Sequence, residues 1–189
     1  MEATRVLGAV IALTLSAATA SACGSSAPRP ASNVGPRPAA VSTIEVDEPH
    51  GNASLDDLGR VSDLVIKAKV TAITHDVLLG QDRSMSYKQY TLKKTGKKGP
   101  SNLDVFVSET IDQVPIAVEN RSEIERGQEA IWSLTKLAPE FGRSGYVLSS
   151  SSGIFPIVKD NIKVTGKSPA AHEASRLGPD DVLERLGSN

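Results

Sequence analysis

The strongest constraint on the fold of this chain of 189 residues is an alternation of apolar and polar side chains that begins at Leu64. Apolar residues occupy every second position from Leu64 to Ala72, and Lys67 and Lys69 lie between them. Successive side chains of a strand point to opposite faces of the sheet. The pattern therefore predicts a half-buried β-strand over residues 64–74 rather than a helix.

Shorter segments of the same kind follow up to residue 164. They are expected at residues 87–93, 103–108, 114–118, 130–134, 146–149, 154–158 and 162–164, the last two as a hairpin around Asp160 and Asn161. Short C-terminal helices are predicted within residues 169–187, because Ser168 can cap a helix that Gly178 ends. Many short strands joined by turns favour an antiparallel barrel or sandwich.

The N-terminal segment has the features of a sorting signal. Arg5 supplies positive charge, and the next 15 residues, Val6–Ala20, are mostly apolar. A run of this length is shorter than the ~20 residues that span a bilayer as a helix, but it suits the core of a signal peptide. We therefore predict that residues 1–22 are a signal peptide that directs the chain to the extracytoplasmic face of the cell membrane.

Two kinds of processing are compatible with the residues that follow. Ala20-Ser21-Ala22 is an acceptable cleavage site for an ordinary signal peptidase. Followed by Cys23, the same residues also resemble the lipobox of bacterial lipoproteins, with Ala20 where that family usually has leucine. The resemblance implies that Cys23 is acylated and becomes the new N-terminus. We favour the lipoprotein, because a free thiol at that position would be a liability in an oxidising compartment.

Residues 23–55 differ in composition from the rest of the chain. They hold five of the 11 prolines and no aromatic residue, and alanine, serine and glycine are common among them. Such a segment cannot bury enough apolar surface to offset its conformational entropy. We predict a disordered tether that spans roughly 30 Å when flexible, which leaves residues 56–189 for the folded domain.

Two segments of that domain resemble a known family. Ser62–Val70 is similar to the first barrel strand of netrin-like domains, which include the tissue inhibitors of metalloproteinases, and Tyr90–Lys93 resembles their next strand. Gly127–Leu137 and Gly153–Phe155 are similar to segments of exported bacterial proteins of unknown function. The resemblance implies a mainly β fold, a small OB-like barrel. The inhibitors bind zinc through an N-terminal Cys-x-Cys that this chain lacks, so no inhibitory residue is carried over.

Two motifs of penicillin-binding proteins occur, but their placement argues against catalysis. Ser133–Lys136 matches S-x-x-K, and Lys94–Gly96 matches K-T-G. The serine of the first motif must begin a helix so that the lysine lies one turn away, whereas Ser133 lies in a predicted strand. The three histidines are too widely spaced to suggest a metal site, and His75 is interpreted as a loop residue. We predict no catalytic set, no metal site and no cofactor.

A basic loop is the main candidate for contact with a partner. Lys93, Lys94, Lys97 and Lys98 surround a Thr-Gly pair between two predicted strands. The loop is either a solvated hairpin tip or a surface that meets an anionic membrane or polymer. The formal net charge of −1 argues against nucleic acid as the partner.

The aromatic residues divide according to the strand face they occupy. Trp132 and Tyr90 share the apolar parity of their strands and are expected in the core. Tyr87 and Phe106 have the opposite parity, so we predict that they face outward as contact residues.

These observations together favour a lipid-anchored binding or accessory protein of the cell envelope without enzymatic activity. Its predicted partners are the membrane, through the lipid on Cys23, and an envelope protein or anionic polymer. Two alternatives stay open. One is a small envelope hydrolase whose site assembles only in the fold, and the other is a module similar to a protease inhibitor.

Overall fold

The computed structural model describes residues 44–45, 50–81, 83–95, 102–118 and 120–188. All of them belong to the unit Ala40–Asn189. The predicted acylation site Cys23 and the loop lysines Lys97 and Lys98 lie outside the described residues.

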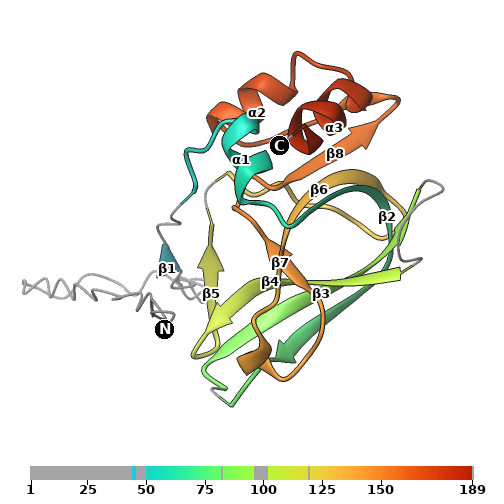
Figure 1. Cartoon of the computed structure of the whole chain (residues 1–189). Coiled ribbons are helices and arrows are strands. Elements are labelled where there is room, and N and C mark those ends of the chain that lie inside the picture. The colour runs from blue at the N-terminus through green and yellow to red at the C-terminus, as the bar shows by residue number, and fades with distance from the viewer. Residues whose placement is uncertain (1–43, 46–49, 82, 96–101, 119, 189) are drawn as a thin grey trace, which may run out of the picture. The chain divides into compact units, whose positions relative to one another are not determined.

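Five strands form a closed β-barrel, which confirms the predicted fold class. They are β2 (Leu64–Leu78), β3 (Met85–Lys94), β4 (Asn102–Ile111), β6 (Glu129–Lys136) and β7 (Tyr146–Leu148). Around the barrel the order is β2-β3-β4-β7-β6 and back to β2, and every pair is antiparallel except β4 with β7. This order, with one parallel pair in the barrel, is that of an OB-type barrel (Figure 1).

Four further strands extend the sheet beyond the barrel. β5 (Val114–Ala117) pairs with the end of β4, and β1 (Ile44–Glu45) lies parallel to β5. β8 (Ile154–Val158) pairs with β6 and forms a hairpin with β9 (Asn161–Ile162). The turn of this hairpin is formed by Lys159 and Asp160, both with positive φ, so it lies one residue earlier than predicted.

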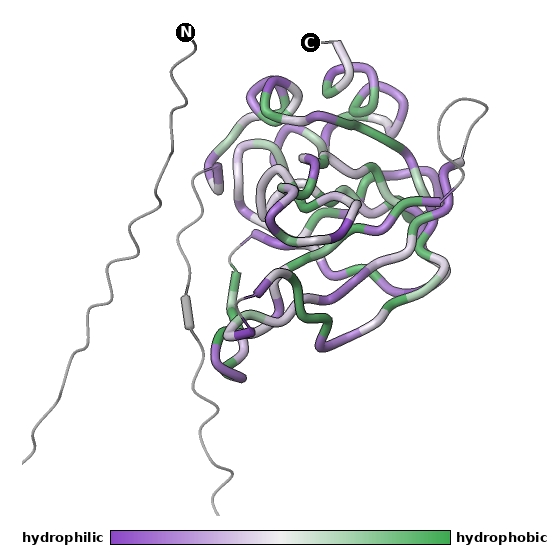
Figure 2. The backbone as a smooth tube through the Cα atoms, turned by 60° about the horizontal axis from the view of Figure 1, so that its bottom comes forward, coloured by the Kyte–Doolittle hydropathy of each residue, from purple (hydrophilic) through white to green (hydrophobic). Residues whose placement is uncertain are grey.

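The barrel interior is filled by apolar side chains from its strands. Trp132 is fully buried there, and its ring is tilted against that of Tyr90 with centroids 5.6 Å apart. The indole nitrogen of Trp132 donates a hydrogen bond to the carbonyl of Ala68 at 3.4 Å. Both aromatic residues were predicted in the core, and the structure confirms it. In Figure 2 hydrophobic and hydrophilic stretches alternate along the backbone of the domain.

The alternation in β2 is interrupted by two β-bulges. Ile66, Ala68 and Val70 point into the barrel as predicted, but the pairing with β3 shifts between Val70 and Ala72. Beyond this bulge Ile73, rather than Ala72, packs against the core. The second shift lies between Thr74 and Val77. A bulge adds one residue to a strand and so moves the following side chains to the other face.

Three helices cover the outer side of β6 and β8 (Figure 1). These are α1 (Leu55–Val61), α2 (Pro169–Ala174) and α3 (Pro179–Gly187). Their apolar faces form a second core with Ile131 of β6 and Phe155 of β8, both fully buried. The predicted C-terminal helices are confirmed. None of the helices in the described part of the chain is long and apolar enough to cross a bilayer.

Helix α1 changes the predicted boundary of the tether. Residues up to 55 were assigned to it, yet Leu55 is fully buried and the carbonyl of Ala53 accepts a hydrogen bond from Ala170 of α2. Ser54 caps the helix, because its hydroxyl accepts a hydrogen bond from the backbone of Asp57 at 3.2 Å. The ordered domain therefore begins before residue 56.

Candidate functional site

The main cluster of polar side chains lies at one mouth of the barrel, where β2 carries its second bulge. The bulge leaves His75 and Asp76 without partners in the register with β3. Asp76 has a φ of 55°, which is uncommon for a residue other than glycine. β-Bulges re-aim side chains, and here the Nδ1 atom of His75 lies 2.6 Å from Oε1 of Glu109 on β4. The pair links two strands that β3 separates.

Glu109 is held as a carboxylate. Its partial burial alone would raise its pKa, but hydrogen bonds from His75 and from the backbone N–H of Asp76, with the charges of His75 and Lys88, outweigh that effect. The net result is a pKa below the ordinary value for glutamate. Because Glu109 is ionised, Nδ1 of His75 is the donor in their hydrogen bond, and the carboxylate fixes the orientation of the ring.

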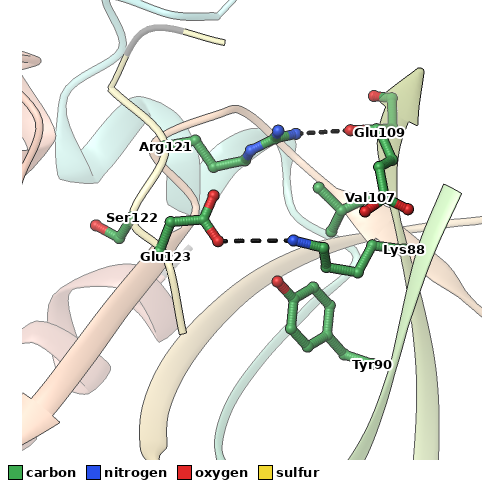
Figure 3. Close-up of a pocket in the computed structure, with 8 residues that line it drawn as sticks. Lys88, Tyr90, Val107, Glu109, Arg121, Ser122 and Glu123 are labelled. Atoms are coloured by element: carbon green, nitrogen blue, oxygen red, sulfur yellow. Dashed lines mark hydrogen bonds and ion pairs between the residues drawn. The ribbon is translucent and has the colours of Figure 1, made fainter. Parts of the chain in front are cut away.

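A small polar pocket adjoins Glu109 (Figure 3). It is a shallow site that is partly open to solvent. Lys88 of β3 and Glu123, from the connection between β5 and β6, point toward each other across it, with Nζ and Oε2 3.7 Å apart. Arg121 lies on the same connection and donates a hydrogen bond to the carbonyl of Ser108 at 2.9 Å. The pocket thus holds two cations and two carboxylates.

Tyr90 forms the floor of this pocket and connects it to the barrel core. Burial raises the pKa of Tyr90 to about 12, with a further contribution from Glu123 that Arg121 opposes. The phenol therefore stays neutral at physiological pH.

The barrel mouth offers an oriented histidine but no complete catalytic set. A carboxylate that orients an imidazole is the arrangement used in general base catalysis. Among the described residues no nucleophile is hydrogen-bonded to His75. Nor do three or more histidine, cysteine, aspartate or glutamate side chains in that part of the chain come together as metal ligands. His75 lies within β2, not in a loop as predicted.

The prediction that Tyr87 and Phe106 are exposed contact residues is wrong. Both do lie on the outer face of the barrel, but they are 8% and 2% exposed. The connection between β6 and β7, which contains the 3₁₀ helix η1 (Pro139–Phe141), covers that face. The ring of Phe141 meets Tyr87 edge-on with centroids 6.5 Å apart. Strand parity correctly predicted that both side chains point to the outer face, but it could not predict that a loop covers that face.

The covering loop is held by specific backbone contacts. The N–H of Gly80, in the connection between β2 and β3, donates to the carbonyl of Phe141 at 3.1 Å, and Leu137 donates to Gly145 at 3.0 Å. Gly145 lies so close to Phe106 that an added Cβ atom would be 2.7 Å from Cε2 of that ring. The loop and the strand face therefore pack as one unit.

Two of the predicted loop lysines are described. Lys93 is exposed at the end of β3, and Lys94 is partly exposed beside it. The register places Lys93 directly opposite Lys69 of β2. No described acidic side chain forms an ion pair with Lys69, Lys93 or Lys94. The basic surface therefore extends from the predicted loop onto the sheet, a feature that the sequence analysis missed.

A group of hydroxyl side chains ties α1 to the barrel. Oγ of Ser62 lies 2.6 Å from Oγ of Ser133 and 3.1 Å from Oγ of Ser149. Thr135 joins through a contact of 3.0 Å to Ser149. Ser133 is fully buried in strand β6. The serine of the S-x-x-K match thus lies in a strand, as predicted, but it is buried and hydrogen-bonded to Ser62 rather than on the surface.

The polar residues of the barrel mouth were missed by the sequence analysis, although the sequence carried a signal for two of them. Lys88 has the same parity in β3 as the buried Tyr90, and Glu109 has the same parity in β4 as the buried Val107. A charged residue at an inward position of a strand is uncommon unless it is paired. Their shared inward parity could have marked them as partners near the barrel mouth.

Comparison with known proteins places the chain in no family. No protein-family model, no curated protein and no solved structure matches it.

Proposed function

We propose that this chain is a lipid-anchored binding or accessory protein on the extracytoplasmic face of the cell membrane, and that it acts without catalysis. The features that support anchoring are the apolar run Val6–Ala20 and the lipobox-like residues that end at Cys23. The single structural observation that supports a binding role is the exposed end of β3. There Lys93 and Lys94 lack ion pairs among the described residues.

The proposed contact surface begins at these two lysines and includes Lys97 and Lys98, which follow in the sequence. Four lysines within six residues attract an anionic partner, either an acidic region of an envelope protein or an anionic polymer. Attraction of this kind acts over about 8 Å at physiological ionic strength. A tether that holds the domain near the envelope therefore favours the encounter.

In-cell crosslinking with mass spectrometry in the native host tests this function. The wild-type chain is compared with a variant in which Lys93, Lys94, Lys97 and Lys98 are changed to serine. The matched control changes four exposed lysines elsewhere to serine, namely Lys136, Lys159, Lys163 and Lys167. We expect a partner that the wild type and the control capture and the first variant does not. Unchanged capture by that variant would exclude the proposed surface.

The anchor is tested separately by Cys23→Ala. If acylation holds the domain at the membrane, this variant moves to the soluble fraction and captures the partner less well. Equal fractionation and equal capture would show that the cysteine has no anchoring role.

A small hydrolase is the second candidate function, and the pair formed by His75 and Glu109 supports it. Their 2.6 Å contact orients the imidazole as in a general base. The test measures hydrolysis of ester and peptide substrates by the wild type, His75→Gln and Glu109→Gln. Activity that both substitutions abolish, while thermal unfolding is unchanged, would support this function. Activity that survives in His75→Gln would exclude the pair as its origin.

A further inference from the structure

Three lysines share the outer face of the sheet formed by β2 and β3. The residues that alternate with them, Ile66, Ala68 and Leu92, are buried in the barrel, so Lys67, Lys69 and Lys93 point away from it. We refer to Lys67, Lys69 and Lys93 as the lysine face. Neither the barrel-mouth pocket nor the groove lined by Asp76 and Arg83 includes these three residues.

The lysine face carries excess positive charge. Lys69 is the direct cross-strand partner of Lys93 on one side and of Glu129 on the other. The carboxylate of Glu129 lies 3.7 Å from Nζ of Lys67, and Asp104 of β4 lies on the same outer face opposite Thr91, so two acidic groups accompany three ammonium groups. Like charges directly opposite each other destabilise a strand pair. The pairing of Lys69 with Lys93 therefore works against the fold, and a bound anionic partner would reverse this effect.

We infer that the lysine face is a docking surface for the phosphate groups of an anionic phospholipid membrane. A bilayer rich in anionic lipid presents an extended negative surface, which attracts every lysine near it at once. A row of ammonium groups on the outside of a sheet suits such a surface better than it suits a single ligand, which would need a pocket. The inference rests on the proposed function, because the tether is what keeps the domain within reach of the membrane.

The test uses Ala40–Asn189, the unit that contains every residue of the three hydrophobic clusters and excludes the apolar N-terminal run. Binding is measured by cosedimentation with vesicles made from equal parts of phosphatidylglycerol and phosphatidylcholine, and with vesicles of phosphatidylcholine alone. We expect binding only to the first kind. The variant Lys69→Gln/Lys93→Gln is expected to bind roughly 20- to 30-fold more weakly, because each lysine near the surface contributes about fivefold.

The matched control is Lys163→Gln/Lys167→Gln, which removes the same charge from two exposed lysines outside the lysine face. It should bind within about twofold of the wild type. Stability is followed through the fluorescence of Trp132, the only tryptophan. Removing the opposed charges should leave the unfolding temperature unchanged or raise it, so weaker binding would not reflect unfolding.

Three results would overturn the inference. They are no binding to phosphatidylglycerol vesicles, equal binding to both kinds of vesicle, and equal weakening by the two variants. Binding to a purified wall polymer but not to vesicles would also overturn it and would favour the polymer named above. The crosslinking experiment is independent. If it fails while vesicle binding holds, the protein-partner function is wrong and the membrane surface is supported.

Discussion

Removing the ring of Phe141 tests whether the loop between β6 and β7 covers the aromatic face of the barrel. Phe141 ends η1 and is partly buried, and its ring packs edge-on against Tyr87 at 6.5 Å. Behind this pair lies Phe106, which is 2% exposed. The variant Phe141→Ala removes the cover without touching either strand.

The expected loss of stability follows from partial burial. Changing a fully buried phenylalanine to alanine costs about 3–5 kcal/mol. About half of that, roughly 1.5–2.5 kcal/mol, applies to a side chain that is only partly buried, and this figure already includes the edge-on ring contact with Tyr87. We therefore expect Phe141→Ala to lower the free energy of unfolding by about 2 kcal/mol. Denaturation in urea, followed by Trp132 fluorescence, measures this, because Trp132 is fully buried in the barrel.

A matched control distinguishes this effect from a general loss of apolar surface. Leu78 is a large apolar residue at the end of β2 that is 45% exposed, so Leu78→Ala should change the free energy of unfolding by no more than about 0.5 kcal/mol. Binding of an apolar dye should increase for Phe141→Ala and not for the control. If Phe141→Ala costs no more than the control, the loop does not stabilise the face, and our account of Tyr87 and Phe106 fails.

Three other substitutions examine contacts elsewhere in the domain. Gly145→Ala should lower the free energy of unfolding by about 1–3 kcal/mol, because its Cβ atom would collide with the ring of Phe106; an unchanged urea midpoint would show that the loop can move aside. Ser62→Ala removes the hydroxyl that is hydrogen-bonded to the buried Ser133, and it should lower the free energy of unfolding by about 1–3 kcal/mol in the same assay. A loss near zero would mean that these hydroxyl contacts do not stabilise the fold. Glu109 has a lowered pKa in the folded state, so its contribution to stability is present above the ordinary value of 4.5 and disappears as the pH falls through the lower folded value. The difference in unfolding temperature between wild type and Glu109→Gln should therefore shrink on acidification below pH 4.5, and a difference independent of pH would contradict the proposed hydrogen bonds.

The strands were predictable because side-chain alternation is a local property of the chain. The apolar faces of β3, β4 and β6 follow a period of two residues without interruption over their core positions. The bulges of β2 were not predictable in this way. Whether Ala72 or Ile73 faces the core depends on where the pairing with β3 shifts, and that position is set by the neighbouring strand rather than by β2 itself.

Helix α1 was missed for a different reason. Leu55 and Leu58 provide its buried face, and a helix of seven residues gives too short a pattern to stand out beside a proline-rich segment. Short helices draw most of their stability from packing. The partners of α1 are α2 and α3, more than 100 residues later in the chain. The start of the folded domain could be recognised only once these helices were placed together.

The barrel-mouth cluster depends on contacts across three strands. His75 and Glu109 are 34 residues apart, and β3 lies between their strands in the sheet. They meet where two irregularities adjoin, because His75 lies in the bulge of β2 and Glu109 lies at a register shift of β4 that leaves it without a partner in β3. Inward parity alone would have indicated Lys88 and Glu109, but not which residue of β2 joins them. The sequence could therefore have indicated two residues of the cluster, but not how the residues of the cluster contact one another.

The covered aromatic face and the exposed lysine face have opposite consequences for recognition. A ligand that used Tyr87 and Phe106 would first have to displace the loop that carries Phe141. The free-energy cost of that displacement is about the 2 kcal/mol expected for Phe141→Ala. Such a cost weakens the affinity of the ligand by roughly 30-fold. A partner that meets Lys69 and Lys93 displaces no packed side chain and relieves a repulsion between directly opposed charges. OB-type barrels often bind ligands on the face that is covered here. In this chain the loop that carries Phe141 covers that face, which is why we propose contact at the outer side of β2 and β3, where Lys69 and Lys93 are exposed.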